Sequence, residues 1–426
     1  MRNPVCLIVL SCVPLLSQTA SRERLTLADA EQLAIRNHPR LQSARFQANA
    51  LRAQVPQVKA ALAPVLVGNL TGSAADNGSR LGAGGLNASS LFSRFGAGIG
   101  VSQTLYDFGR TNKLAESAAL RADAQDVTVD AVRGELILQI RQAYLRVLET
   151  QRALQLGQQS LQSRQLIRRQ VQAFTENQLR STLDLQFAEV AVSEAETLLA
   201  RLEGELEAAN ATLAAALGFI DERRFELEEV SQPVMLPLSV DSLVEEALNT
   251  RPELIARRRQ QEAARQFAVS ESRLTLPSVS TTGAFGFIPT GDPRLRSRYG
   301  GLGLNINIPV FNGRIFDARR QEAEARARSA GQDTRDLELR IAREVRTAYA
   351  EARNAQRRMS LAERQSQQSI HLFRLAQARY EAGLGNIVEV NQAELARFTA
   401  ELGVEDARYG LLGATAVLDF AIGRLR

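Results

Sequence analysis

Two stretches of the chain, 95–106 and 298–310, alternate apolar residues with small or polar ones. This period of two predicts strands with one apolar face, because successive side chains of a strand point to opposite sides. In the second stretch the apolar positions are Leu302, Leu304, Ile306 and Ile308. Partner strands are predicted from Pro64 and over 278–287. Each pair then forms a hairpin of strands about ten residues long, the length of a tilted strand that crosses a membrane.

After each of these strands the hydrophobic period changes to seven. Small and aliphatic residues recur at the seam positions, which predicts long helices packed along their length. We expect helices of about 60 residues, roughly 90 Å long at 1.5 Å per residue. The seam residues predicted to be buried between helices are Ile140, Val147, Leu154, Val345, Ala352 and Met359.

The order of strand, sharp turn and long helix occurs twice. Tyr144 aligns with Tyr349 at a shift of 205, and Pro39 aligns with Pro252 at a shift of 213, so one change of 213 − 205 = 8 residues reconciles both. The two halves thus stay aligned through both the strands and the long helices, which predicts an internal duplication. The predicted organisation is a first repeat at 25–218, a linker at 219–237 and a second repeat at 238–423, with strands near 64–106 and 277–310.

Residues 1–21 read as a signal peptide, with a short apolar run followed by small and polar residues. A loose lipoprotein-type box ends at Cys12, which leaves acylation of that cysteine as an alternative form of processing. No later segment is long and apolar enough for a membrane helix, so any membrane span must come from a closed barrel of strands. Four strands cannot close a barrel, whereas three copies would supply 3 × 4 = 12.

Charge and aromatic content change this picture little. The net charge of +5 is spread along the helices, which favours solvated helix faces and not nucleic-acid binding. The aromatic residues gather around the strands, as the girdles of membrane strands do. The predicted interfacial aromatics are Phe92, Phe95, Phe285, Phe287 and Tyr299.

The sequence offers little catalytic chemistry. His38 and His371 are the only histidines, and neither has a cysteine or carboxylate at ligand spacing. The glycines at 96–100 and 301–303 lie in strands and lack the lysine of a phosphate-binding loop. We therefore predict no enzyme activity, no cofactor and no metal site.

Three sets of motifs carry a family resemblance. They are Leu25-Thr-Leu-Ala-Asp-Ala-Glu-Gln-Leu-Ala34 with Asn37-His-Pro39, Leu105-Tyr-Asp-Phe-Gly-Arg110 with Ile308-Pro-Val-Phe-Asn-Gly313 in the other half, and Tyr380-Glu-Ala-Gly383 followed by Ile387-Val-Glu-Val390. With these motifs the chain resembles the TolC family of outer-membrane efflux proteins over nearly all residues after 24. The resemblance implies an α+β membrane protein: a homotrimer whose 12-stranded β-barrel, four strands from each protomer, continues into a long α-helical coiled-coil barrel in the periplasm. It also implies contact with outer-membrane lipid, a periplasmic adaptor (membrane fusion protein) and an inner-membrane pump.

The resemblance further implies a constriction at the periplasmic tip. By position its residues are Asp184, Tyr380, Glu389 and Gln392, with Tyr380 able to bond Asp184. The family's tip arginine corresponds to Gly385, so we expect the ion-pair part of the lock to be absent. Ordinary polar groups of helix turns are the alternative interpretation of these residues.

The main prediction is an outer-membrane exit duct of a tripartite efflux pump or type I secretion system, gated at its periplasmic tip. A soluble periplasmic coiled-coil scaffold or pump adaptor, whose strands form a small soluble domain, is the alternative. The two-faced strands favour the duct, because their other side carries Ser102, Thr104, Asn305 and Asn307.

Overall fold

The computed structural model describes residues 24–73, 82–83, 86–87, 94–221, 223–230, 239–289 and 296–425. The predicted signal peptide, Cys12 and Phe92 lie outside these residues. The described residues form two compact units. Unit 1 takes its residues from Met1–Asn37, Gln139–Val234 and Arg357–Gly413. Unit 2 takes its residues from His38–Leu138, Met235–Gln356 and Ala414–Arg426.

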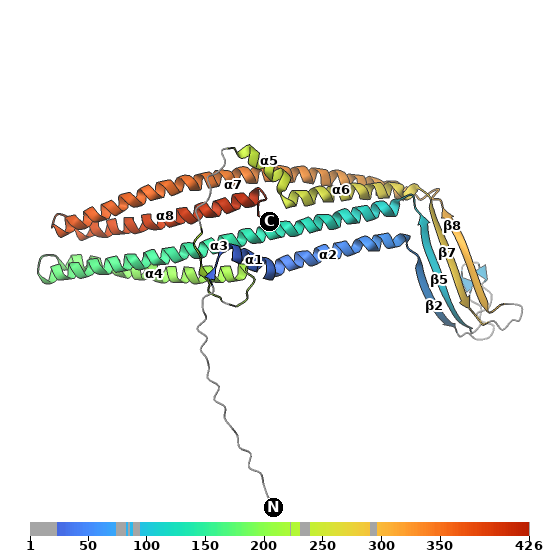
Figure 1. Ribbon diagram of the computed structural model, residues 1–426, viewed down its shortest axis with the longest axis horizontal. Helices are drawn as coiled ribbons and strands as arrows, with labels where there is room; N and C mark the ends of the chain where they lie inside the picture. Colours follow the sequence, from blue (N-terminus) through green and yellow to red (C-terminus); the bar gives the residue numbers. More distant parts are fainter. Residues whose placement is uncertain are drawn as a thin grey trace, which may run out of the picture. The chain divides into compact units, whose positions relative to one another are not determined.

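Apart from the two-residue strands β3 and β4 of the first half, the described elements follow one another in the same order in both halves of the chain (Figure 1). The first half contains β1 (Arg24–Leu25), α1 (Leu27–Asn37), α2 (Pro39–Lys59), the 3₁₀ helix η1 (Ala60–Leu62), β2 (Val65–Ser73), β3 (Gly82–Ala83), β4 (Leu86–Asn87), β5 (Arg94–Tyr106), α3 (Arg110–Glu176) and α4 (Thr182–Ala216). The second half contains β6 (Glu226–Leu227), α5 (Val240–Thr250), α6 (Pro252–Ser272), the 3₁₀ helix η2 (Arg273–Thr275), β7 (Ser278–Phe287), β8 (Arg298–Asn307), α7 (Ile315–Glu381) and α8 (Ile387–Ala421).

Corresponding helices have the same length. Both α3 and α7 have 67 residues, both α4 and α8 have 35, and both α2 and α6 have 21. Their starts differ by 315 − 110 = 205, 387 − 182 = 205 and 252 − 39 = 213, which are the two shifts found in the sequence. The compact units are not these repeats, since each unit takes elements from both halves.

A tight turn converts each long strand into a long helix. Phe108 and Gly109 adopt φ of 54° and 77°, and Asp107 then caps the start of α3 by accepting from the backbone N–H of Gly109 (3.1 Å) and Thr111 (2.7 Å). In the second copy Gly313 and Arg314 have φ of 62° and 66°. The change of period in the sequence therefore coincides with a left-handed turn.

In unit 2, β2, β5, β7 and β8 form one antiparallel sheet in that order (Figure 1). Residues that are directly opposite in the ladder share a face, so the register assigns every side chain to one of two sides. One side carries Leu66, Leu70, Phe95, Ala97, Ile99, Val101, Val279, Phe285, Phe287, Leu302, Leu304 and Ile306, with Gln103, Thr281 and Arg298 as polar exceptions. The other side carries Asn69, Thr71, Ser102, Thr104, Ser280, Thr282, Asn305 and Asn307, together with most of the strand glycines and with Val65, Val67, Ala284 and Tyr299 as apolar or aromatic exceptions.

The helical core of unit 2 contains part of the predicted seam. Val345 and Ala352 are fully buried there, packed with Ile341, Leu254 and Ile422. In unit 1, Ile140 and Val147 are also fully buried. Leu154 and Met359 are only partly buried, so the buried stripe does not follow a strict repeat of seven along the whole of each helix.

In unit 1, part of the predicted linker is ordered structure. β6 pairs in parallel with β1, and the buried hydroxyl of Tyr144 donates to the carbonyls of Leu25 (2.8 Å) and Glu228 (2.7 Å), sharing its one proton. Burial of Tyr144 raises its pKa to about 12, so it remains a donor at physiological pH. The segment around β6 is thus fixed to α3 by this side chain, which the prediction of a linker did not anticipate.

Candidate functional site

The four predicted tip residues lie in unit 1, at the α3–α4 and α7–α8 turns or on α4 and α8 just beyond them. Both turns close in the same way: Leu179 N–H donates to Phe174 O (2.9 Å), and Leu384 N–H donates to Arg379 O (2.8 Å). Gln178 and Gly383 supply the positive φ that such helix ends require. Because these positions also differ by 205, the two copies of the repeat build equivalent tips.

Tyr380 is the centre of this region. It is buried, its ring centroid lies 6.4 Å from that of Phe174, and its hydroxyl lies 3.5 Å from Asp184 Oδ2. Burial, helped by the negative charge of Asp184, raises the pKa of Tyr380, so the hydroxyl is protonated and can donate. The structure therefore brings together the two residues that the resemblance paired, although the contact is long for a hydrogen bond between oxygens.

Arg180 holds Tyr380 more closely than Asp184 does. Its Nη2 donates to Tyr380 O at 2.6 Å, and its guanidinium carbon lies 4.4 Å from the centroid of the tyrosine ring. The charge-assisted hydrogen bond and the cation–π contact from Arg180 together contribute more stabilising free energy than the long contact between the Tyr380 hydroxyl and Asp184. Sequence reasoning missed Arg180, since it lies in a turn without periodicity.

Glu389 is exposed and makes an ion pair within its own turn. Its Oε2 lies 3.8 Å from Arg379 Nε, and Arg379 also donates to Leu384 O (3.0 Å). This ion pair lies within the α7–α8 hairpin and does not join it to the other hairpin. The absence of an ion pair from the lock, expected because Gly385 stands at the arginine position, therefore stays a prediction. A side chain at Gly385 would crowd Glu389, as an added Cβ would lie 3.2 Å from Oε2.

Gln392 is exposed and lines a shallow groove between α4 and α8. The groove has a volume of about 180 Å³, and apolar side chains form much of its wall. Its other lining residues include Phe187, Val190, Val388, Asn391 and Leu395. Gln392 lies one helical turn after Glu389 on α8, but among the described residues it forms no hydrogen bond with Glu389 or Tyr380.

A buried ionic cluster accompanies the tip residues in unit 1. Arg164 of α3 and Glu394 of α8 pair at 3.3 Å, and Ser160 donates to the same carboxylate at 3.1 Å. The sequence carries a signal for this cluster. Arg164 lies on the buried side of α3, four residues after Ser160 and three before Ile167, and a charge at such a position requires a partner.

Of the predicted interfacial aromatics that the structure describes, Phe95, Phe285 and Phe287 share the apolar face of the sheet, and all three are about half exposed. Tyr299 belongs to the opposite face, where it covers Gly98 and Gly286. A Cβ on either glycine would lie within 2.5 Å of the tyrosine hydroxyl. The aromatic set is therefore divided between the two sides of the sheet.

Within the described ranges, no group of three or more histidine, cysteine or carboxylate side chains could hold a metal ion. None of the helices in those ranges has an apolar stretch long enough to cross a membrane.

The family described as Outer membrane efflux protein matches residues 30–219 and 243–424, which is most of both halves. The chain belongs to this family. The predicted TolC-type outer-membrane efflux protein, with its mixed fold of strands and long helices, is thereby confirmed, and so is its location in the outer membrane with extension into the periplasm.

Individual relatives agree with the family. Outer membrane protein TolC of Vibrio cholerae is 27% identical over 417 residues, covering 94% of this chain and 91% of the relative. Outer membrane protein OprJ of Pseudomonas aeruginosa is 25% identical over 393 residues, covering 89% and 81%. A solved structure of CusC has the same fold, with a TM-score of 0.83 at 22% identity over 93% of this chain and 92% of that one. These outer-membrane efflux proteins are channels and not enzymes.

Proposed function

We propose that three copies of the chain form the exit duct of a tripartite efflux pump or type I secretion system, a passive conduit gated at its periplasmic tip. The observation that carries this proposal is the four-stranded sheet of unit 2. Its edge strands, β2 and β8, have no further strand beside them in the described chain, and one face exposes large apolar side chains such as Leu302, which is 75% exposed.

In an isolated chain, the unpaired backbone groups of the sheet edges and the exposed apolar face both raise the free energy. Lipid can cover the apolar face, but lipid cannot satisfy the backbone groups of an open edge. Pairing β8 of one copy with β2 of the next satisfies both edges, and three copies give 3 × 4 = 12 strands. The polar face, with its serine, threonine and asparagine side chains, would then line a water-filled lumen.

The groove between α4 and α8 supports the adaptor as a partner. Exposed apolar side chains follow both helices from the turns, and they include Leu183, Phe187, Val190, Val388 and Leu395. A helix that presents apolar residues at intervals of three and four can bury these side chains, in the manner of helix-in-groove recognition. A periplasmic adaptor with a helical hairpin, linked to an inner-membrane pump, has this chemistry.

Disulfide trapping of the sheet edges tests the proposal. Cysteine at Val67 of β2 would be combined in turn with cysteine at Gly301, Gly303 or Asn305 of β8, all on the polar face. Each double-cysteine variant would be purified in detergent and oxidised. At least one of them is expected to give dimer and trimer bands on non-reducing gels. Cysteine at Ser102 of the central strand β5, combined with Asn305, is the matched control and should stay monomeric. Failure of every edge pair to cross-link would contradict closure by neighbouring copies.

A further inference from the structure

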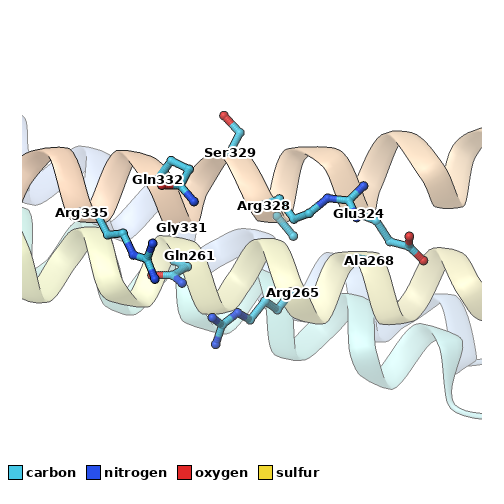
Figure 2. Close-up of a pocket in the computed structure, with 10 residues that line it drawn as sticks. Gln261, Arg265, Ala268, Glu324, Arg328, Ser329, Gly331, Gln332 and Arg335 are labelled. Carbon is cyan, nitrogen blue, oxygen red and sulfur yellow. The ribbon is translucent and has the colours of Figure 1, made fainter.

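A second groove, in unit 2, is lined by cationic side chains. It lies between α6 and α7 and has a volume of about 720 Å³ (Figure 2). Three arginines and one carboxylate line it, giving 3 − 1 = +2. They are Arg265, Arg328, Arg335 and Glu324. Arg335 reaches from α7 toward Gln261 of α6, so an amide lies beside a guanidinium at this end.

Two of these arginines differ from their neighbours on the same helix. Between Ile315 and Arg340 of α7, Arg319, Arg320, Arg326 and Arg340 each pair with a carboxylate. Among the described residues, Arg328 and Arg335 have no such partner. Both are exposed, and both line the groove. Arginines that remain unpaired in a chain rich in carboxylates are available to an external anion.

The floor of the groove is made of small residues. Ala268, Ala327 and Gly331 line it, and Gly331 stands between the two unpaired arginines. A Cβ on Gly331 would already lie 3.4 Å from Gln261 Nε2, so a longer side chain would fill the groove. The hollow therefore depends on this glycine, and the arginines stand along its rim.

We propose that this groove binds an anion that carries two or more linked phosphate groups. Arg328 and Arg335 are seven residues apart, about 10.5 Å along one side of the helix. Both side chains are exposed and long enough to lean toward each other across Gly331, so that each guanidinium fork holds one charged group of the anion. The inference does not depend on the gate or on closure of the duct, because all of its residues belong to unit 2 of one chain.

Calorimetric titration of the detergent-purified full chain with inorganic pyrophosphate tests the site. Arg328→Gln combined with Arg335→Gln should weaken binding by about tenfold or more. Arg326→Gln is the matched control, since Arg326 is 72% exposed and already paired with Glu322. Gly331→Leu should also weaken binding while leaving every charge in place. Binding by the double variant equal to that of the parent, or an equal loss in the control, would overturn the proposal.

A second arm distinguishes the two sources of such an anion. The titration would be repeated in nanodiscs of phosphatidylglycerol and of phosphatidylcholine. Weaker pyrophosphate binding in the anionic discs identifies a lipid headgroup as the competitor, and equal binding identifies a diffusible anion; either result supports the site. No pyrophosphate binding by the parent, with loss of oligomer in the double variant, would show that a neighbouring copy fills the groove and would overturn the proposal.

Discussion

Arg164 and Glu394 form an ion pair inside the helical bundle of unit 1, where their side chains are 7% and 1% exposed. Arg164 also donates to Ala191 O at 2.8 Å, and Arg397 lies 3.1 Å from the same glutamate. The pair therefore links α3, α4 and α8. A buried pair of this kind is costly to break, because the remaining charge keeps its desolvation penalty.

Replacing Arg164 with Met should lower the free energy of unfolding by about 3 kcal/mol, since the buried Glu394 would lose its buried counter-charge and keep only the more exposed Arg397. Circular dichroism during thermal and urea unfolding measures the change. Arg201→Met is the control: Arg201 pairs with Glu205 on the surface, with side chains 66% and 40% exposed, and its loss should cost under about 1 kcal/mol. Similar losses in the two variants would mean that the buried pair adds no specific stability.

Ala352→Glu should disrupt the core of unit 2. Ala352 has no exposed surface and packs with Val345, Leu254 and Ile422 of its own chain, so a glutamate there buries an unpaired charge at several kcal/mol. We expect a lower melting temperature, faster proteolysis and, as a consequence, loss of oligomer on native gels. The exposed neighbour Arg353 provides the control, since Arg353→Glu makes a larger change of charge at a solvated position. An intact core in Ala352→Glu would contradict the packing described for this seam.

Stability at acidic pH should depend on Glu229. Burial alone would raise the pKa of Glu229, but hydrogen bonds from Arg152 (2.7 Å) and Tyr409 (3.0 Å), with the charge of Arg408, lower it below the usual value of 4.5. A carboxyl with a depressed folded pKa stabilises the protein above its unfolded pKa, and that contribution is lost as pH falls through the folded pKa.

Glu229→Gln should therefore lower the melting temperature at pH 7 and leave a smaller further loss between pH 5 and pH 3 than in the parent. Melting curves across this range measure the difference. Glu226→Gln, three residues away at an exposed position, should keep the pH dependence of the parent. Parallel curves for Glu229→Gln and the parent would exclude Glu229 as a source of acid sensitivity.

Periodicity predicted the elements well because one pattern determines each of them. The alternation at Leu302, Leu304 and Ile306 shows directly that these three side chains lie on one side of a strand. The register of the sheet places the apolar residues of the other strands on the same side. Strands β1 and β6 escaped prediction because two residues carry no period. They depend instead on a distant hydroxyl, that of Tyr144.

The contacts of the tip were less predictable than its location. The sequence shift of 205 aligns Asp184 with Glu389 and so predicted that they occupy equivalent positions. It could not show that Arg180 lies on the ring of Tyr380. That contact depends on how two helical hairpins pack, which involves long-range geometry. Arg379 was overlooked for a similar reason, since only the closed turn brings it to Glu389.

Glu389→Ala should weaken the cation selectivity of the duct. Three glutamates around an axis would attract cations, and their removal leaves Arg379 without its carboxylate partner in the turn. Reversal potentials in planar bilayers under a potassium chloride gradient measure the change. Glu381→Ala alters the same charge in the same turn, at a residue whose recorded contact is with Gln377, and serves as the control. Equal reversal potentials in the two variants would place the selective constriction elsewhere.

Arg180→Gln should open the duct more than Tyr380→Phe does. A hydrogen bond to a charged donor contributes about 1.5–3 kcal/mol, and a cation–π contact adds about 0.5–1 kcal/mol. Tyr380→Phe removes only a contact of 3.5 Å to Asp184 and keeps the ring against Arg180. Single-channel recordings should therefore show a larger rise in open probability for Arg180→Gln, with Arg169→Gln, an exposed position on α3, unchanged. If Tyr380→Phe opens the duct as much as Arg180→Gln, the hydroxyl bond to Asp184 is the main restraint, and Arg180 only supports the fold of the turn.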